Sequence, residues 1–140
     1  MSHIALAASD AEIDRCFPVM LELRSHLVQT EFVQQVQRQQ QHGYQLVYLE
    51  SDDRVKAVAG FRLSECLAAG NFLYVDDLVV RSRDRSHGYG EALFQWLIDH
   101  AKAHHCEQLS LDSGVQRVAA HRFYLRQRME ITSHHFALKL

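Results

Sequence analysis

The chain has 140 residues, 47% of them hydrophobic and 23% charged, a balance typical of a globular protein that builds its own core. Its formal net charge is −2 and it has no Lys/Arg block, so nucleic acid is not expected as its main partner. Three widely spaced cysteines (Cys16, Cys66 and Cys106) indicate a reducing compartment, and no segment has the pattern of a membrane span or a signal peptide. We therefore expect a cytoplasmic protein without a membrane partner, folded as a single domain over 1–140.

Hydrophobic periodicity predicts helices and strands along the whole chain. In the first half we expect a strand over 3–8, helices over 9–27 and 30–41, and strands over 44–50 and 55–64. In the second half we expect a strand over 72–80, a helix over 90–104, a strand over 108–112, a helix over 115–128 and a final strand over 130–140. This order predicts an α/β (α+β) fold in which about four helices flank a mixed, largely antiparallel central sheet.

A polar loop with two glycines, Gly88 and Gly90, joins the strand over 72–80 to the following helix. Glycine lets the backbone approach a ligand closely, and the first turn of a helix offers unpaired N–H groups and partial positive charge. Such a site suits a pyrophosphate, and three arginines add positive charge beside it: Arg81, Arg83 and Arg85. A tight turn with solvated arginines explains the local pattern equally well, because neither GxxxxGK[ST] nor a full GxGxxG is present.

Two motifs in the second half of the chain resemble the signatures of a known family. Arg85-x-x-Gly88-x-Gly90 is similar to the coenzyme A signature of the GNAT superfamily of acyl-coenzyme A-dependent N-acetyltransferases. Ala120-His121-Arg122-Phe123-Tyr124, on the next predicted helix, looks like the second signature of that family. The resemblance covers about 72–140. It implies a GNAT-like sheet that splays after 72–80, and acetyl-coenzyme A as the co-substrate that enters the gap.

The resemblance also implies which residues contact acetyl-coenzyme A. The main chain of the loop is expected to bind the pyrophosphate through Arg85, Ser86, His87, Gly88, Tyr89 and Gly90. The backbone of the strand end is expected to pair with the pantetheine arm through Leu78, Val79 and Val80. An N–H group of Val79 or Val80 would then polarise the thioester carbonyl. Arg117 stands where the family often has Asn, and it is expected to face a phosphate of the coenzyme.

Amide formation from a thioester requires the amine to lose a proton and the departing thiolate to gain one. Tyr124 matches the tyrosine of the family, and the resemblance implies that it is the acid. Asp76 and Asp77 interrupt an otherwise apolar strand and are the candidate bases. Strict alternation places them on opposite faces, and Asp76 ranks first because it matches an acidic position of polyamine-type members; a bulge would reverse this order. The structural alternatives are a core tyrosine, and carboxylates that cap a loop or pair with an arginine.

The motifs together predict direct transfer of an acetyl group from acetyl-coenzyme A to a primary amine of a small molecule or a protein. Three acidic residues favour a cationic amine such as a polyamine, an aminoglycoside or a lysine side chain: Asp76, Asp77 and Asp112. The alternative is a non-catalytic acyl-coenzyme A-binding or regulatory module with the same fold. No metal is expected, because His100 and His104 are not part of an HExxH motif, and a homodimer is left open.

Overall fold

Five strands in the order β1-β2-β3-β4-β5 form the sheet of the computed structural model, which describes the whole chain, Met1–Leu140. The strands are β1 (Ser2–Leu6), β2 (Tyr44–Ser51), β3 (Arg54–Cys66), β4 (Gly70–Val80) and β5 (Gln108–Leu111). The helices are α1 (Asp10–Leu23), α2 (Gln29–Gln40), the short 3₁₀ helix η1 (Ser82–Asp84), α3 (Tyr89–Ala103) and α4 (Val118–Arg126). The predicted mixed α/β architecture is thereby confirmed. None of the helices combines the length and the apolar character needed to cross a lipid bilayer.

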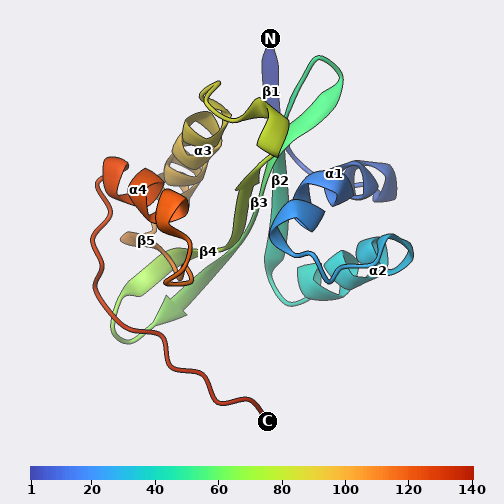
Figure 1. Cartoon of the computed structure of the whole chain (residues 1–140). Coiled ribbons are helices and arrows are strands. Elements are labelled where there is room, and N and C mark those ends of the chain that lie inside the picture. Colours follow the sequence, from blue (N-terminus) through green and yellow to red (C-terminus); the bar gives the residue numbers. More distant parts are fainter. The chain divides into compact units, whose positions relative to one another are not determined.

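The chain divides into two units, Met1–Ser110 and Leu111–Leu140, and each is described by itself. In the first unit, α1 and α2 cover one face of the sheet and α3 covers the other (Figure 1). A capping box at Ser9 and Glu12 starts α1, because each of these side chains accepts a hydrogen bond from the backbone N–H of the other residue. The core under α1 and α2 includes Ile13, Phe17, Phe32, Val58 and Val79, while Phe61 packs against Trp96 of α3.

Strand β4 is an inner strand of the sheet, between β3 and β5. Its whole length pairs antiparallel with β3. On the other side, β5 has only four residues and begins beside the start of β4, where the Glu107 N–H donates a 2.8 Å hydrogen bond to the Asn71 carbonyl. Because β4 has eleven residues, β5 accompanies only its first part, and the end of β4 is left to its pairing with β3.

A β-bulge interrupts β4 at the acidic pair. Gly60 of β3 faces Asp77, and the next residue, Phe61, faces Val75, so Asp76 is the extra residue of β4. In a bulge, two residues of one strand oppose a single residue of its partner, and the alternation of side chains breaks at that point. The expectation that Asp76 and Asp77 lie on opposite faces of the sheet is therefore wrong: both side chains lie on the α1–α2 face, where they line one cleft.

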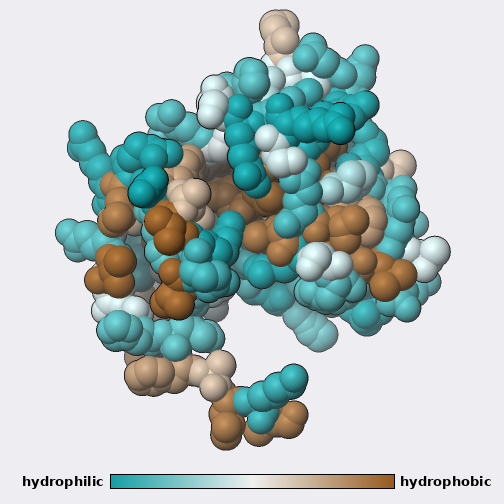
Figure 2. Space-filling model, in the orientation of Figure 1, coloured by the Kyte–Doolittle hydropathy of each residue, from teal (hydrophilic) through white to brown (hydrophobic).

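The predicted final strand over 130–140 is also wrong. In the second unit, this segment has no regular secondary structure and its large apolar side chains are exposed: Ile131, Phe136, Leu138 and Leu140. Figure 2 shows hydrophobic side chains along this tail. Alternating apolar residues show that side chains could share one face of a strand. A strand also needs a neighbouring strand for its backbone hydrogen bonds, and the pattern does not show whether one is present.

The other differences concern element ends. Helix α2 begins at Gln29, one residue before the predicted start, with Val28 as its N-cap, and it ends at Gln40. Helix α4 begins at Val118 and ends at Arg126, and is shorter than predicted at both ends. Helix ends are set by the last few hydrogen bonds and are less visible in the sequence than the apolar stripe itself.

Candidate active site

The loop that follows β4 leads directly into the N-terminus of α3. Two of its residues have left-handed backbone conformations: Ser86, with φ of 67°, and Gly88, with φ of 80°. His87 between them has a negative φ, and such alternation turns successive N–H groups toward one side, which forms an anion-binding concavity. Gly88 is also the N-cap of α3, and no side chain caps the first N–H groups of this helix. These donors are therefore free to bind an anion.

The space beside Gly88 is open. A Cβ atom built on this residue would meet no atom of the protein within 4 Å, so a ligand can approach its backbone closely. The ring of His87 stays beside the loop, because its Nδ1 lies 3.1 Å from the Asp84 carbonyl oxygen and 3.0 Å from the Arg85 carbonyl oxygen. It also stacks on Tyr89 with ring centroids 5.9 Å apart. The loop thus has the shape and the donors that a pyrophosphate requires.

Only part of the expected positive charge is available at this loop. Asp84 forms an ion pair with Lys56 at 3.2 Å through Oδ1, and another with Arg81 at 2.8 Å through Oδ2. The Arg81 contact is an ion pair without hydrogen-bond geometry, because Oδ2 of Asp84 has no hydrogen-bond partner. Arg81 therefore fixes the start of the loop, whereas Arg83 and Arg85 are exposed and form no ion pair with Asp84.

The end of β4 presents backbone groups at the edge that faces away from β3. The Arg81 N–H donates a 2.7 Å hydrogen bond to the Lys56 carbonyl, so these two residues form a hydrogen-bonded antiparallel pair. Hydrogen-bonded and non-hydrogen-bonded pairs alternate, and the pair Val80–Ala57 is therefore non-hydrogen-bonded. The Val80 N–H points away from β3, while the Val79 N–H points toward it. Leu78 and Val79 are buried by their side chains and Val80 partly so.

Asp76 and Asp77 lie side by side at the bulge, and each contacts an arginine. Oδ2 of Asp76 accepts a 2.9 Å hydrogen bond from Nε of Arg62. Oδ1 of Asp77 accepts a 2.9 Å hydrogen bond from Nε of Arg24, and its Oδ2 accepts a 2.8 Å hydrogen bond from the Tyr44 hydroxyl. Arg24 also donates from Nη2 to the Asp76 carbonyl at 2.8 Å. Both carboxylates are thus held in place by side chains from other elements.

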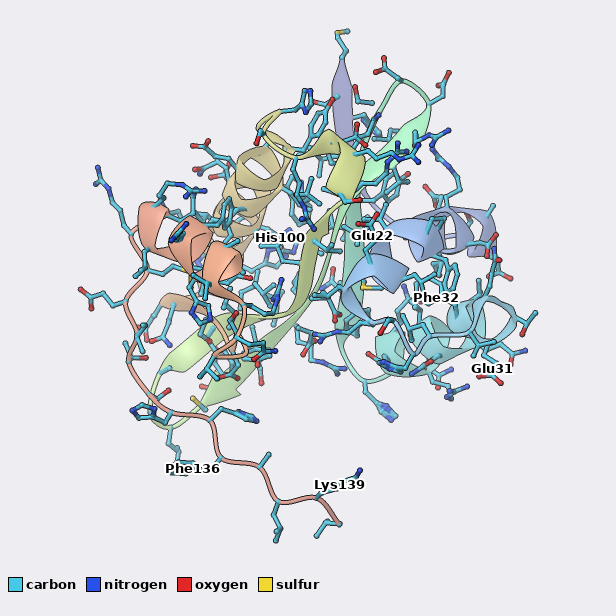
Figure 3. All side chains as sticks on the ribbon, in the orientation of Figure 1. Glu22, Glu31, Phe32, His100, Phe136 and Lys139 are labelled. Atoms are coloured by element: carbon cyan, nitrogen blue, oxygen red, sulfur yellow. The ribbon has the colours of Figure 1, made fainter.

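These groups line a cleft of about 460 Å³ on the α1–α2 face of the sheet. Its walls come from α1, α2 and the chain between them, and its floor comes from the strands: Met20, Arg24, His26, Leu27, Phe32, Gln35, Val36, Gln39, Tyr44, Arg62, Tyr74, Asp76 and Asp77. Figure 3 shows Phe32 on this side of the sheet and His100 on the opposite side. A volume of this size suits a small-molecule ligand.

Burial changes the acidity of two groups in the cleft. It raises the pKa of Asp76 above its ordinary value, while the hydrogen bond and the charge of Arg62 act in the opposite direction. It also raises the pKa of the Tyr44 hydroxyl well above its ordinary value, and the neighbouring Asp77 charge adds to this effect. Tyr44 therefore stays protonated and acts as a hydrogen-bond donor to Asp77.

Arg24, Tyr44 and Arg62 were not among the residues that the motifs select. Arg62 gives one usable signal in the sequence. It is a charged residue that directly follows the apolar segment of a strand, and a partly buried charge needs a partner. Arg24 and Tyr44 give no comparable signal, since they reach Asp77 from 53 and 33 positions away in the chain.

Tyr124 and Arg117 belong to the second unit. The partly buried ring of Tyr124 packs edge-on against Phe123, with ring centroids 5.7 Å apart, and its carbonyl accepts a hydrogen bond from the Met129 N–H at 3.1 Å. Arg117 is the N-cap of α4, and its carbonyl accepts a 3.0 Å hydrogen bond from the His121 N–H. In the same unit, Nε2 of His121 lies 2.8 Å from the Gly114 carbonyl oxygen.

Comparisons with known proteins agree with this arrangement. The family model described as Acetyltransferase (GNAT) family matches residues 11–128. The Uncharacterized N-acetyltransferase YhdJ of Bacillus subtilis (strain 168) is 33% identical over 125 residues, which cover 89% of this chain and 88% of that protein. Two solved structures align over 100% of both chains at 16% identity: a transcriptional regulator from Bacillus halodurans C-125, with a TM-score of 0.88, and a Trypanosoma brucei acetyltransferase, with a TM-score of 0.82.

The chain therefore belongs to the GNAT family of acetyltransferases. It is an N-acetyltransferase, an enzyme that transfers an acetyl group to an amine. Its family match spans residues of both units, including the loop before α3 and the helix α4.

Proposed function

We propose that this enzyme takes its acetyl group from acetyl-coenzyme A and transfers it directly to a primary amine of a small molecule or a protein. The observation that carries the proposal is the loop from Arg85 to Gly90, which leads into the uncapped N-terminus of α3 with open space beside Gly88. Acetyl-coenzyme A supplies the acetyl group as a thioester. The family match across both units supports one acetyltransferase domain over 1–140, and three free cysteines support a cytoplasmic location.

On the coenzyme side, the backbone N–H groups of the loop bind the pyrophosphate, and Arg83 and Arg85 add charge from the loop surface. The edge of β4 opposite β3 binds the pantetheine arm through the backbone of Leu78 and Val80. Of the two donors considered for the thioester carbonyl, Val80 is the better one, because its N–H points away from β3. Such a donor contributes about 3 kcal/mol in well-studied enzymes. Arg117 faces a phosphate of the coenzyme.

On the acceptor side, Asp76 accepts the proton that the amine must lose. Its Oδ2 is bound to Arg62, and neither arginine of the cleft uses its Oδ1, which remains for the amine or for a water between them. The raised pKa of Asp76 makes it a better base than an ordinary aspartate. Asp77 uses both oxygens for Arg24 and Tyr44 and positions the bulge. Tyr124 then gives a proton to the departing thiolate.

Coenzyme A binding is tested with two matched glycine substitutions. Gly88→Ala and Gly43→Ala both place a Cβ on a residue with positive φ, at 80° and 94°, and in both cases the Cβ meets no atom within 4 Å. Their conformational cost is therefore similar, at about 1–2 kcal/mol. Only Gly88→Ala places the Cβ where the pyrophosphate should lie. Calorimetry should show at least about 10-fold weaker coenzyme A binding for Gly88→Ala alone.

The transfer itself is tested by following free thiol release from acetyl-coenzyme A with a panel of primary amines. Amine-dependent release, with the acetylated amine identified by mass spectrometry, is the expected result. Equal coenzyme A affinity of both glycine variants would refute the loop as the binding site. Binding without any amine-dependent release would favour the non-catalytic alternative.

A further inference from the structure

The charges of the acceptor cleft are matched in pairs. Asp76 lies 2.9 Å from Arg62, and Asp77 lies 2.9 Å from Arg24, in each case between a carboxylate oxygen and Nε of the guanidinium. Besides His26, the lining therefore holds two negative and two positive side chains. Two unpaired carboxylates would attract a polycation, but each charge of this pair has a compensating arginine. A polyamine or an aminoglycoside would bring further positive charge beside these arginines.

The cleft also keeps both a hydrogen-bond donor and a hydrogen-bond acceptor that no residue of the protein uses. A guanidinium has five N–H donors, and Arg24 uses only Nε and Nη2 for the contacts with Asp77 and Asp76. Its Nη1 remains, and 44% of its side chain is exposed. Arg62 is more fully engaged, because Nη1 donates to the His42 carbonyl at 3.1 Å and Nη2 to Oε1 of Gln39 at 3.4 Å. The open donor is thus on Arg24, and the open acceptor is Oδ1 of Asp76.

The geometry points to an acceptor of a particular class: a small amine that also carries an anionic group, with its ammonium or amine at Asp76 and its anionic group at Arg24. This inference rests on the proposed function of the cleft as the acceptor site. A guanidinium binds carboxylates and phosphates through the same paired N–H groups, so either anion fits the chemistry. The apolar side chains of Met20, Leu27 and Phe32 can cover the carbon skeleton between the two charges.

Asp76 and Asp77 suggest a cationic amine when their partners are unknown, whereas the paired arrangement favours an acceptor whose own charges are mixed. Arg24 is then a specificity-determining residue, because it distinguishes an amine with an anionic group from the same amine without one.

The test compares pairs of amines that differ only in the anionic group. We would measure kcat/KM by free thiol release for 4-aminobutyrate against 4-aminobutyramide, for O-phosphoethanolamine against ethanolamine, and for spermidine. A charge-assisted hydrogen bond predicts that the anionic member of at least one pair is preferred by about 10- to 100-fold. The two pairs distinguish a carboxylate from a phosphate as the anionic group. Preference for spermidine, or equal values within both pairs, would overturn the inference.

The role of Arg24 is tested by how that preference responds to substitution. Arg24→Gln should reduce the ratio of kcat/KM between the anionic and the neutral amine toward 1, and the change should appear in KM. Arg24→Lys should restore part of this ratio. Arg15→Gln is the matched control, because Arg15 lies on α1, the helix that Arg24 caps, and pairs with Glu50 outside the cleft. The ratio for this variant should stay as in the wild type. An unchanged ratio in Arg24→Gln would refute the assignment.

Failure of this inference can be separated from failure of the proposed function. Direct calorimetry of the anionic and neutral amines with the coenzyme A-bound protein measures the preference without turnover. If no amine is acetylated but the anionic amine still binds more tightly in an Arg24-dependent way, the transfer proposal fails and the recognition proposal stands. If amines are acetylated without any such preference, the reverse holds.

Discussion

The Tyr44 side chain crosses directly over Gly60, the residue of β3 that faces Asp77 at the bulge. A Cβ on Gly60 would overlap the hydroxyl oxygen and the ring of Tyr44. Only the absence of a side chain at this position lets the hydroxyl reach Oδ2 of Asp77, to which it donates a 2.8 Å hydrogen bond. A glycine inside an apolar strand thus marks a close approach that positions the acidic pair.

Gly60→Ala should destabilise the protein by about 1–3 kcal/mol, because an overpacked site must displace a buried ring. The midpoint of urea unfolding measures this change. In a double-mutant cycle with Tyr44→Leu, the cost of Gly60→Ala should fall, since the ring that it would overlap is gone. Additive effects of the two substitutions would show that Gly60 matters for a reason other than the Tyr44 contact.

The pH dependence of kcat should report Asp76. The base must be ionised, so kcat falls as the pH drops through the pKa of Asp76, and this acidic limb should lie above the ordinary aspartate range because burial raises that pKa. Asp76→Asn should flatten the limb. Arg62→Gln removes a group that lowers the pKa of Asp76, so the limb should move to higher pH. Asp10→Asn, an exposed carboxylate bound to Gln37, is the control and should leave the profile unchanged.

Most elements of the fold could be predicted because apolar spacing is a local property of the sequence. The loop from Arg85 to Gly90 could be predicted for the same reason, since a strand end, two glycines and a helix start follow one another directly. The bulge could not be predicted, because the extra residue, Asp76, is defined by pairing between β4 and β3 and not by β4 alone.

The composition of the cleft could not be predicted either. Arg24 and Tyr44 meet at Asp77 only after α1, β2 and β4 have packed together, and no periodicity connects positions so distant in the chain. The sequence therefore showed two carboxylates in a strand and offered pairing with an arginine as an alternative, but it did not identify Arg24 and Arg62 as the partners. Without these partners, the acidic residues favoured a cationic amine as the acceptor.

His100 should make the folded protein sensitive to mild acid. Burial, together with the nearby His104, lowers the pKa of His100, and its Nε2 is buried without a hydrogen-bond partner. The unfolded chain takes up a proton on this imidazole near its ordinary pKa of about 6.5, before the folded protein does, so the free energy of unfolding decreases as the pH falls below that value.

His100→Phe keeps an aromatic ring beside Trp96, whose centroid lies 4.7 Å from that of His100, and removes the titration. Urea unfolding between pH 5 and pH 7 should therefore show a shallower loss of stability than in the wild type. His3→Gln changes an exposed histidine and should leave the slope as it is. A wild-type slope in His100→Phe would show that other groups cause the acid sensitivity.

Ser86→Gly should stabilise the loop between β4 and α3. A left-handed conformation costs a non-glycine residue about 1–2 kcal/mol, and Ser86 has φ of 67°. Glycine removes this cost but adds about 0.5–1 kcal/mol of chain entropy in the unfolded state, so the net gain in unfolding free energy should be about 0.5–1 kcal/mol. Ser82→Gly provides the control, because the φ of Ser82 is negative and only the entropic loss remains. Thermal or urea unfolding of both variants measures the difference, and a Ser86→Gly protein no more stable than Ser82→Gly would contradict it.

Tyr124→Phe should separate catalysis from binding. The substitution keeps the ring that packs against Phe123 and deletes only the hydroxyl, which we propose as the proton donor to the departing thiolate. A donor that matters mainly in the transition state lowers kcat without weakening the ground-state complex, so kcat should fall by about 10- to 1,000-fold with little change in coenzyme A affinity. Tyr48→Phe, which removes a hydroxyl bound to Glu12 outside the cleft, controls for the loss of a phenol and should keep the wild-type kcat. A pre-steady-state burst would identify slow product release, and the comparison is then made on single-turnover rates. If the chemical step of Tyr124→Phe runs at the wild-type rate, the hydroxyl has a structural role and water supplies the proton.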